Sequence, residues 1–178
     1  MRWLPVSALL AAVPISAHAT QYATPEQAQR LLFPAATAFT PADALLTDAQ
    51  RDHVAQASGA RVRDAHVRAW VARDVQGAAL GRVILDEVTG KHDLITYVVG
   101  IDLAGAVTGV EILVYRENHG GEIRQAAWRE GFRGKRAGDP VTLGADIVNI
   151  SGATLSCAHV TDGVRRLLQV DAALGKAR

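Results

Sequence analysis

The apolar residues of this chain change their spacing twice, from a helical period to alternation and back. Helical spacing marks residues 24–32 and 47–57, and each segment opens with Thr and carries Gln three residues later. A Thr-x-x-Gln start is typical of a capping box, which closes a helix N-terminus. Pro34 and Gly59 follow the two segments and are expected to end the helices. A Pro-, Ala- and Thr-rich connector, residues 35–46, lies between them.

The middle of the chain alternates between apolar and polar residues, which is the pattern of half-buried strands. Short connections that contain Gly separate the strands, and such connections favour antiparallel neighbours. The pattern therefore predicts a meander with strands at residues 67–72, 80–88, 94–101 and 107–115.

Helical spacing returns at residues 122–132, with Gly134 just beyond the end of the segment. Residues 141–150 read as a short extended piece that leads into a closing helix. The buried face of that helix is expected to carry Cys157, Val160, Val164, Leu167 and Leu168. The predicted fold class is α+β: an antiparallel sheet of about four or more strands with N- and C-terminal helices packed on it.

The first 19 residues have the layout of a secretory signal peptide. A positive Met1-Arg2 precedes an apolar stretch, and the segment ends in small residues. A buried helix or a membrane anchor is the alternative, but Pro5 and Pro14 disfavour a helix and the stretch is short for a bilayer. We therefore expect residues 1–19 to be removed before Thr20, residues 20–62 to form an N-terminal helical segment, and residues 63–178 to form the main domain. The expected location is the periplasm, with a position at the periphery of the inner membrane left open.

Composition and charge narrow the possible functions. About half of the 178 residues are hydrophobic, which is enough for one core. Removal of Arg2 with the leader leaves 18 residues of each charge, so the chain lacks the positive footprint of a nucleic-acid-binding protein. The single cysteine, Cys157, excludes an intramolecular disulfide and a Cys-rich metal site, and it is expected to be buried.

Two segments carry candidate chemistry, and the first is Ser151-Gly152-Ala153-Thr154. The free N–H groups and the dipole of a helix start suit a phosphate, and Gly152 and Ala153 keep the approach clear. Thr154 is expected at the edge of the apolar stripe, where another molecule can reach its hydroxyl. Taken alone, these residues favour an ordinary helix cap at Ser151, because Ser and Thr are common at caps.

The second segment, residues 115–124, joins the last strand to the next helix. Its glycine pair, Gly120-Gly121, permits a flat ligand to approach the backbone, and Glu117, His119 and Arg124 are candidates for contacts with the polar edge of that ligand. Taken alone, the segment favours a simple connection with solvated charges.

Together the two segments resemble the FMN-binding domain family, which includes the G subunit of the Rnf electron-transport complex and the C subunit of the sodium-translocating NADH:quinone reductase. The resemblance covers residues 80–168. It is carried by Tyr115-Arg116-Glu117, Gly120-Gly121-Glu122, Phe132-Arg133-Gly134-Lys135, and Asp146 with Ser151-Gly152-Ala153-Thr154.

The resemblance implies that an FAD:protein FMN transferase moves FMN from FAD onto Thr154 as a phosphoester. Asp146, Ser151, Gly152 and Ala153 then belong to the recognition motif, and Glu117, His119, Gly120 and Gly121 lie along the cofactor. It also implies an exported electron carrier without independent catalytic turnover, which serves a redox partner such as a membrane reductase.

Two other readings stay open at this point. One is a non-redox ligand-binding module of the same fold, with flavin held loosely or not at all. The other is a cysteine hydrolase that uses Cys157 and His159, which is disfavoured because residues two apart on a helix do not face each other.

Overall fold

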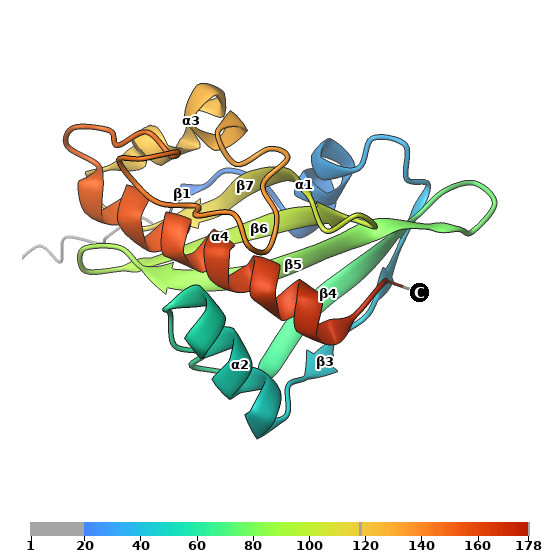
Figure 1. The fold of residues 1–178 in the computed structure, drawn as a ribbon. Coiled ribbons are helices and arrows are strands. Elements are labelled where there is room, and N and C mark those ends of the chain that lie inside the picture. The colour runs from blue at the N-terminus through green and yellow to red at the C-terminus, as the bar shows by residue number, and fades with distance from the viewer. Residues whose placement is uncertain (1–19, 118, 178) are drawn as a thin grey trace, which may run out of the picture.

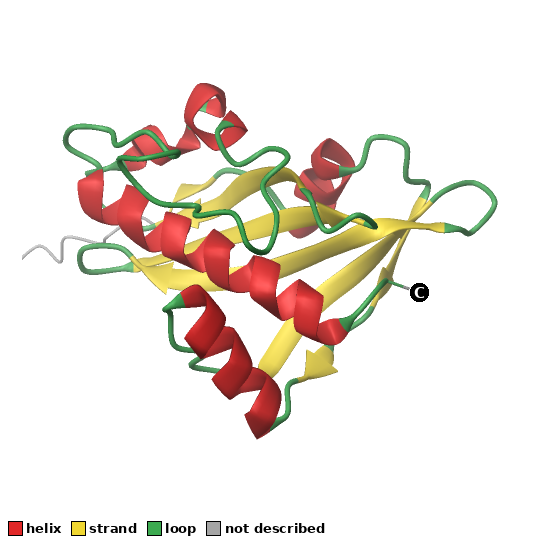
Figure 2. Ribbon diagram, viewed as in Figure 1, coloured by secondary structure: helices red, strands yellow, loops and turns green. Residues whose placement is uncertain are grey.

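Four long strands make up the centre of the molecule: β4 (His66–Arg73), β5 (Ala79–Thr89), β6 (Leu94–Asp102) and β7 (Val107–Tyr115). The computed structural model describes residues 20–117 and 119–177. Short strands β1 (Thr20–Gln21), β2 (Ala38–Pro41) and β3 (Ala44–Leu45) extend the sheet at its edges. All neighbours are antiparallel, in the order β1-β7-β6-β5-β4-β2, with β3 also paired to β4 (Figures 1 and 2). The predicted α+β class and meander are confirmed.

Strand alternation sends neighbouring residues to opposite faces of the sheet, and both faces are covered. Ile84 and Val99 pack under the long helix α4 (Thr154–Leu174), which crosses one face. Val83 and Val98 point the other way, toward α1 (Pro25–Leu32). The sheet is therefore a layer between an N-terminal helix and the C-terminal helix.

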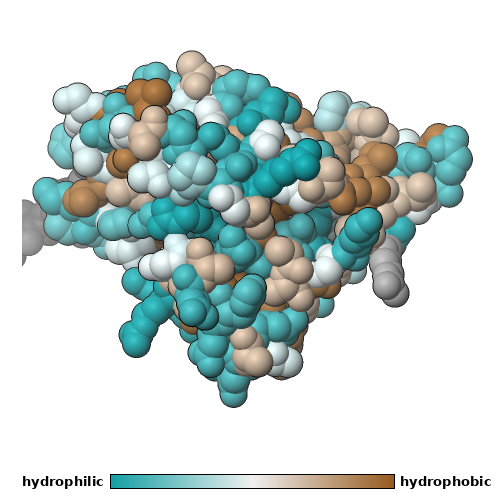
Figure 3. Space-filling view, in the orientation of Figure 1, coloured by the Kyte–Doolittle hydropathy of each residue, from teal (hydrophilic) through white to brown (hydrophobic). Residues whose placement is uncertain are grey.

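The two expected capping boxes are present. The side chain of Thr24 accepts a hydrogen bond from the backbone of Gln27 at the start of α1, and Thr47 does the same with Gln50 at the start of α2 (Asp48–Ser58). Helix α2 ends at Gly59, which has the left-handed φ of 68°. Helix α2 lies beside α4, and hydrophilic residues cover most of the surface that the two helices form (Figures 1 and 3).

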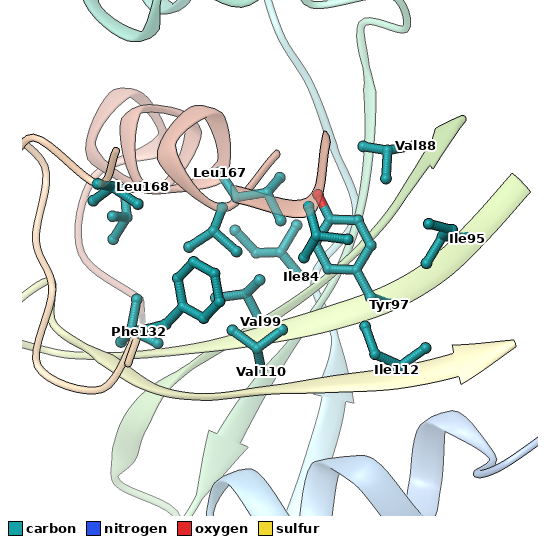
Figure 4. Close-up of a cluster of buried hydrophobic side chains, with 14 of the residues drawn as sticks. Ile84, Val88, Ile95, Tyr97, Val99, Val110, Ile112, Phe132, Leu167 and Leu168 are labelled. Atoms are coloured by element: carbon teal, nitrogen blue, oxygen red, sulfur yellow. The ribbon is translucent and has the colours of Figure 1, made fainter. Parts of the chain in front are cut away.

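The larger core lies between α4 and the sheet, and Figure 4 shows its central side chains. Tyr97 of β6 is fully buried there, and its hydroxyl reaches the helix and donates a hydrogen bond to Asp86. Asp86 also accepts from Arg166 of α4 at 2.5 Å. A Cβ atom on Gly163 would lie 2.0 Å from the Tyr97 hydroxyl oxygen, so the helix passes this ring only because residue 163 is glycine.

The connector at residues 35–46 holds two strands that the sequence did not predict. Strand β2 pairs with β4 from Ala38↔Arg73 to Pro41↔Trp70, and Asp43 accepts a hydrogen bond from the backbone of Ala69. Residues 38–41 have no alternating pattern of their own. They form a strand because they pair with the edge of β4.

The prediction of one helix over residues 122–132 is wrong. A 3-10 helix η1 (Gly121–Arg124) and a short helix α3 (Ala126–Glu130) replace it, with Gln125 extended between them. Ile123 and Trp128 are both buried, although five residues on a continuous helix would place them about 140° apart. The break at Gln125 lets both side chains reach the core.

The prediction of an extended piece at residues 141–150 is also wrong. The segment is a tight loop in which the carbonyl of Thr142 accepts from the N–H groups of Ala145, Asp146 and Ile147. The carboxylate of Asp146 accepts from the N–H of Thr142 at 2.6 Å. These bonds fold the segment back on itself.

The expected signal peptide, residues 1–19, lies outside the described residues. Within residues 20–117 and 119–177, no helix has the length and apolar character needed to cross a bilayer.

Candidate functional site

The two candidate segments lie at the same end of the sheet. Strand β7 ends at Tyr115, where the antiparallel β6 begins at Leu94 and β5 ends at Thr89. Helix α4 starts above this end, and the loop after β7 returns toward it (Figure 1). The sheet topology therefore brings together segments that are about 30 residues apart in the chain.

Helix α4 begins at Thr154, and no side chain within residues 20–117 and 119–177 caps it. The N-cap residue is Ala153, which is buried, and Ser151 makes no capping bond, so the simple reading of Ser151 as the cap is wrong. Gly152 has a left-handed φ of 86°, and a Cβ atom there would meet nothing within 4 Å. The first N–H groups of a 21-residue helix are thus left for water or a ligand at an open surface.

Thr154 is exposed at this helix start. Its hydroxyl oxygen accepts a long hydrogen bond of 3.4 Å from the side-chain amide of Asn149. The sequence did not single out Asn149, because an Asn in a loop has many ordinary uses. Cys157 is fully buried, as expected from the position of the apolar stripe.

The glycine loop touches the first turn of α4. Gly120 has a φ of 85°, and a Cβ atom on it would lie 2.7 Å from the Tyr115 hydroxyl oxygen and 2.9 Å from Ser156 Oγ. The same Cβ would lie 3.5 Å from Cα of Ala153. Gly120 is therefore required for close packing of the loop against the Ser151–Thr154 segment.

Tyr115 stabilises the contact between the glycine loop and α4 through its hydroxyl group. Its hydroxyl donates to the carbonyl of His119 and lies 2.9 Å from Ser156 Oγ. Burial raises the pKa of the Tyr115 phenol, so it remains a hydrogen-bond donor at neutral pH. The His119 side chain itself is exposed.

Gly121 opens the 3-10 helix and its carbonyl accepts from Arg124 Nε at 3.0 Å. The Arg124 guanidinium lies over the ring of Tyr22, 4.1 Å from its centroid. The N-terminal segment thereby braces the loop through a cation–π contact.

Glu117 is turned toward the β5–β6 hairpin. Its carboxylate accepts from the N–H groups of His92 at 2.5 Å and Asp93 at 3.0 Å. A Cβ on Gly90 would lie 2.6 Å from Glu117 Oε1, which explains the glycine in this turn. Burial alone would raise the pKa of Glu117, but the N–H groups of Asp93 and His92 outweigh it and lower that pKa.

Asp146 is also occupied by its own loop. It accepts from the N–H of Thr142 and pairs with Lys135 Nζ at 2.8 Å. Burial opposes ionisation, but the Lys135 ammonium and the Thr142 N–H prevail and hold the pKa of Asp146 below its usual range. The structure thus gives both carboxylates, Glu117 and Asp146, a role in shaping the two loops.

Acid should reduce the stability that the Glu117 and Asp146 carboxylates give to their two loops. Both carboxylates have a lowered pKa in the folded state, so their contribution is present at neutral pH and is lost as the pH falls below about 4. We expect Glu117→Gln to lower the urea midpoint at pH 7 and to lie closer to the wild type at pH 3. Glu130→Gln, which removes an exposed surface pair with Arg133, should change the midpoint little at either pH. An equal loss for Glu117→Gln at both pH values would contradict this role.

A cavity of about 700 Å³ lies elsewhere on α4. It is bounded by the loop after α2, β4, β5 and α4, and its lining includes Arg61, Arg63, Val88, His159 and Arg166. His159 is five residues after Thr154, which places it about 140° around the helix. The cavity therefore opens on a different side of α4 from the Thr154 hydroxyl. No group of His, Cys, Asp or Glu suited to a metal ion occurs among the described residues.

The fold and this end of the sheet define an α+β domain with an exposed hydroxyl at an uncapped helix start. Residues 90–169 match the model of the FMN-binding domain family. The matched region begins at the β5–β6 turn and includes the glycine loop and most of α4.

A solved structure is also similar: the crystal structure of Shewanella oneidensis NqrC. It has 15% sequence identity and a TM-score of 0.49, over 81% of this chain and 70% of that chain. A comparison with curated proteins gave no match.

Of the predicted site residues, the structure brings Gly120 close to Ala153, the residue before Thr154. Ser151 and Gly152 form the exposed turn before the helix. The residues that sequence reasoning missed are Asn149, which contacts Thr154, and Ser156, which contacts Tyr115.

Proposed function

We propose that this protein is an exported electron carrier whose FMN is attached through a phosphoester to Thr154. The observation that carries the proposal is the exposed Thr154 hydroxyl at the uncapped start of α4, inside a region that matches the FMN-binding domain family. Bound flavin supplies one- and two-electron chemistry, while the chain supplies position and electrostatics.

The residues present fit a phosphate at this place. The first N–H groups of α4 have no side-chain cap among the described residues and carry the positive end of the helix dipole, which favours an anion. Gly152 leaves open space beside the helix start. A phosphoester on Thr154 would place its charge where these groups are free.

The loading step needs a partner enzyme. The Thr154 oxygen forms a bond to the FMN phosphorus of FAD, the pyrophosphate bond of FAD breaks, AMP leaves, and the hydroxyl proton passes to a base of the FAD:protein FMN transferase. In this proposal the chain needs no base of its own, and among the described residues the side-chain partner of the Thr154 hydroxyl is the amide of Asn149.

The proposed function also includes export of the protein to the periplasm. We expect removal of residues 1–19 and a mature N-terminus at Thr20, so that the carrier works in the periplasm with a redox partner such as a membrane reductase. N-terminal sequencing of the protein from a periplasmic fraction tests this, and a retained Met1 would oppose it.

The alternative is a non-redox module that binds its ligand without a covalent bond. The 700 Å³ cavity favours it, because its volume suits a small molecule and it lies away from Thr154.

Purification with and without the transferase separates the two functions. We expect flavin to remain with the denatured, washed protein only after co-expression with the transferase. Flavin that washes out in both cases would support the alternative and contradict covalent attachment.

A further inference from the structure

A buried pair of hydroxyl groups joins the glycine loop to the first turn of α4. Tyr115 ends β7 and Ser156 is the third residue of α4, and both side chains are almost fully buried. Their oxygens are 2.9 Å apart. The single phenol proton of Tyr115 goes to the carbonyl of His119, so Ser156 is the donor in the bond between the two hydroxyls.

The junction leaves no room for a side chain at Gly120. A Cβ there would collide with both hydroxyl oxygens, at 2.7 Å and 2.9 Å. The loop backbone, the strand end and the helix turn therefore fit together as one unit. Strand β1 adds to it from the sheet edge, where Thr20 pairs with Tyr115.

The first turn of α4 is anchored in the core by the buried Ala153 and Cys157. No side chain of the described residues caps it, and the bond from the N–H of Ala153 to the carbonyl of Ile150 is the backbone tie just before it. Thr154 is exposed, with one long contact to Asn149. Helix ends without caps fray, so a tie at Ser156 has a direct effect on the order of Thr154.

We propose that Tyr115 and Ser156 are positioning residues for flavin attachment. Their hydroxyl pair fixes the glycine loop against α4 and keeps Thr154 in the conformation that the transferase binds. This inference rests on the proposed function. Neither residue touches the reacting atoms; both act through the first turn of the helix.

The chain offers a matched control for each change. Tyr97→Phe also removes a buried phenol hydroxyl, which bonds to Asp86 of β5 and lies against Gly163 at the middle of α4. Ser58→Ala also removes a buried serine hydroxyl, which donates to the carbonyl of Val54 at the end of α2. Both controls weaken the core without touching the helix start.

The experiment follows flavin transfer onto the purified mature protein with the transferase and FAD, at several protein concentrations. We expect Tyr115→Phe and Ser156→Ala to lower kcat/KM of transfer about tenfold, because misplacement of a reacting group slows a positioned reaction. Tyr97→Phe and Ser58→Ala should stay within about twofold of the wild type, even where their thermal midpoints fall equally. The Tyr115→Phe/Ser156→Ala double variant should be no slower than Tyr115→Phe, since both changes break one unit.

Transfer rates of Tyr115→Phe and Ser156→Ala equal to the wild type would overturn the inference. So would an equal slowing by the two controls, which would trace the effect to general stability. If the wild type itself gains no flavin, the proposed function fails instead, and the two failures are thereby distinguished.

Discussion

Replacement of Thr154 by alanine should abolish covalent flavin. The phosphoester requires the Thr154 oxygen, and alanine has no atom to replace it. Thr154 is exposed, and its side-chain hydrogen bond within the described part of the chain is the long 3.4 Å bond from Asn149, so the change in folding free energy should stay within about 0.5 kcal/mol. The measurement is flavin fluorescence of the denatured protein band after co-expression with the transferase, which we expect to fall to background.

Two matched variants control this result. Thr154→Ser keeps a hydroxyl at the same place and should remain fluorescent. Thr142→Ala removes another exposed threonine hydroxyl of the preceding loop, where it bonds to the Pro140 carbonyl, and should also remain fluorescent. A fluorescent Thr154→Ala band would show that another residue carries the flavin.

Replacement of Gly163 by alanine should give the largest loss of stability among the changes discussed. The new Cβ would lie 2.0 Å from the Tyr97 hydroxyl oxygen and 3.0 Å from its Cζ, so the fully buried ring must shift and disturb its bond to Asp86. Overpacking costs about 1–3 kcal/mol or more, and the gain of about 1 kcal/mol from Ala in a helix offsets part of it. Because a 2.0 Å contact lies at the upper end of that range, we expect a net loss of about 2 kcal/mol, measured by urea unfolding of the flavin-free protein.

The Tyr97→Phe background tests the cause of that loss. Without the hydroxyl, the nearest ring atom to the new methyl is Cζ at 3.0 Å, so Gly163→Ala should cost less in Tyr97→Phe than in the wild type. The same cost in both backgrounds would contradict a clash with the hydroxyl.

The long elements were predictable because their signals are local. The capping boxes at Thr24 and Thr47, the glycine stop at Gly59 and the alternation of β4 to β7 depend on residues close in sequence. Strands β2 and β3 were missed because the edge of β4 orders them, and the break at Gln125 was missed because it depends on which side chains the core accepts. Tertiary contacts decide such segments, and a sequence window does not contain them.

In the candidate site, too, some features follow from local sequence and others depend on tertiary contacts. The exposed Thr154 and the buried Cys157 follow from the helical period of α4. The hydroxyl pair of Tyr115 and Ser156 spans 41 residues and has no local pattern. The direction of the Glu117 carboxylate likewise depends on a hairpin turn 24 and 25 residues earlier, which no motif spacing reveals.

The most direct test of covalent attachment is the mass of the mature protein after co-expression with the transferase. We predict a gain equal to one FMN less one water, carried by the tryptic peptide of residues 137–165 and assigned by fragmentation to Thr154. An unchanged mass, or the added group on a different residue of that peptide such as Ser151 or Ser156, would contradict it.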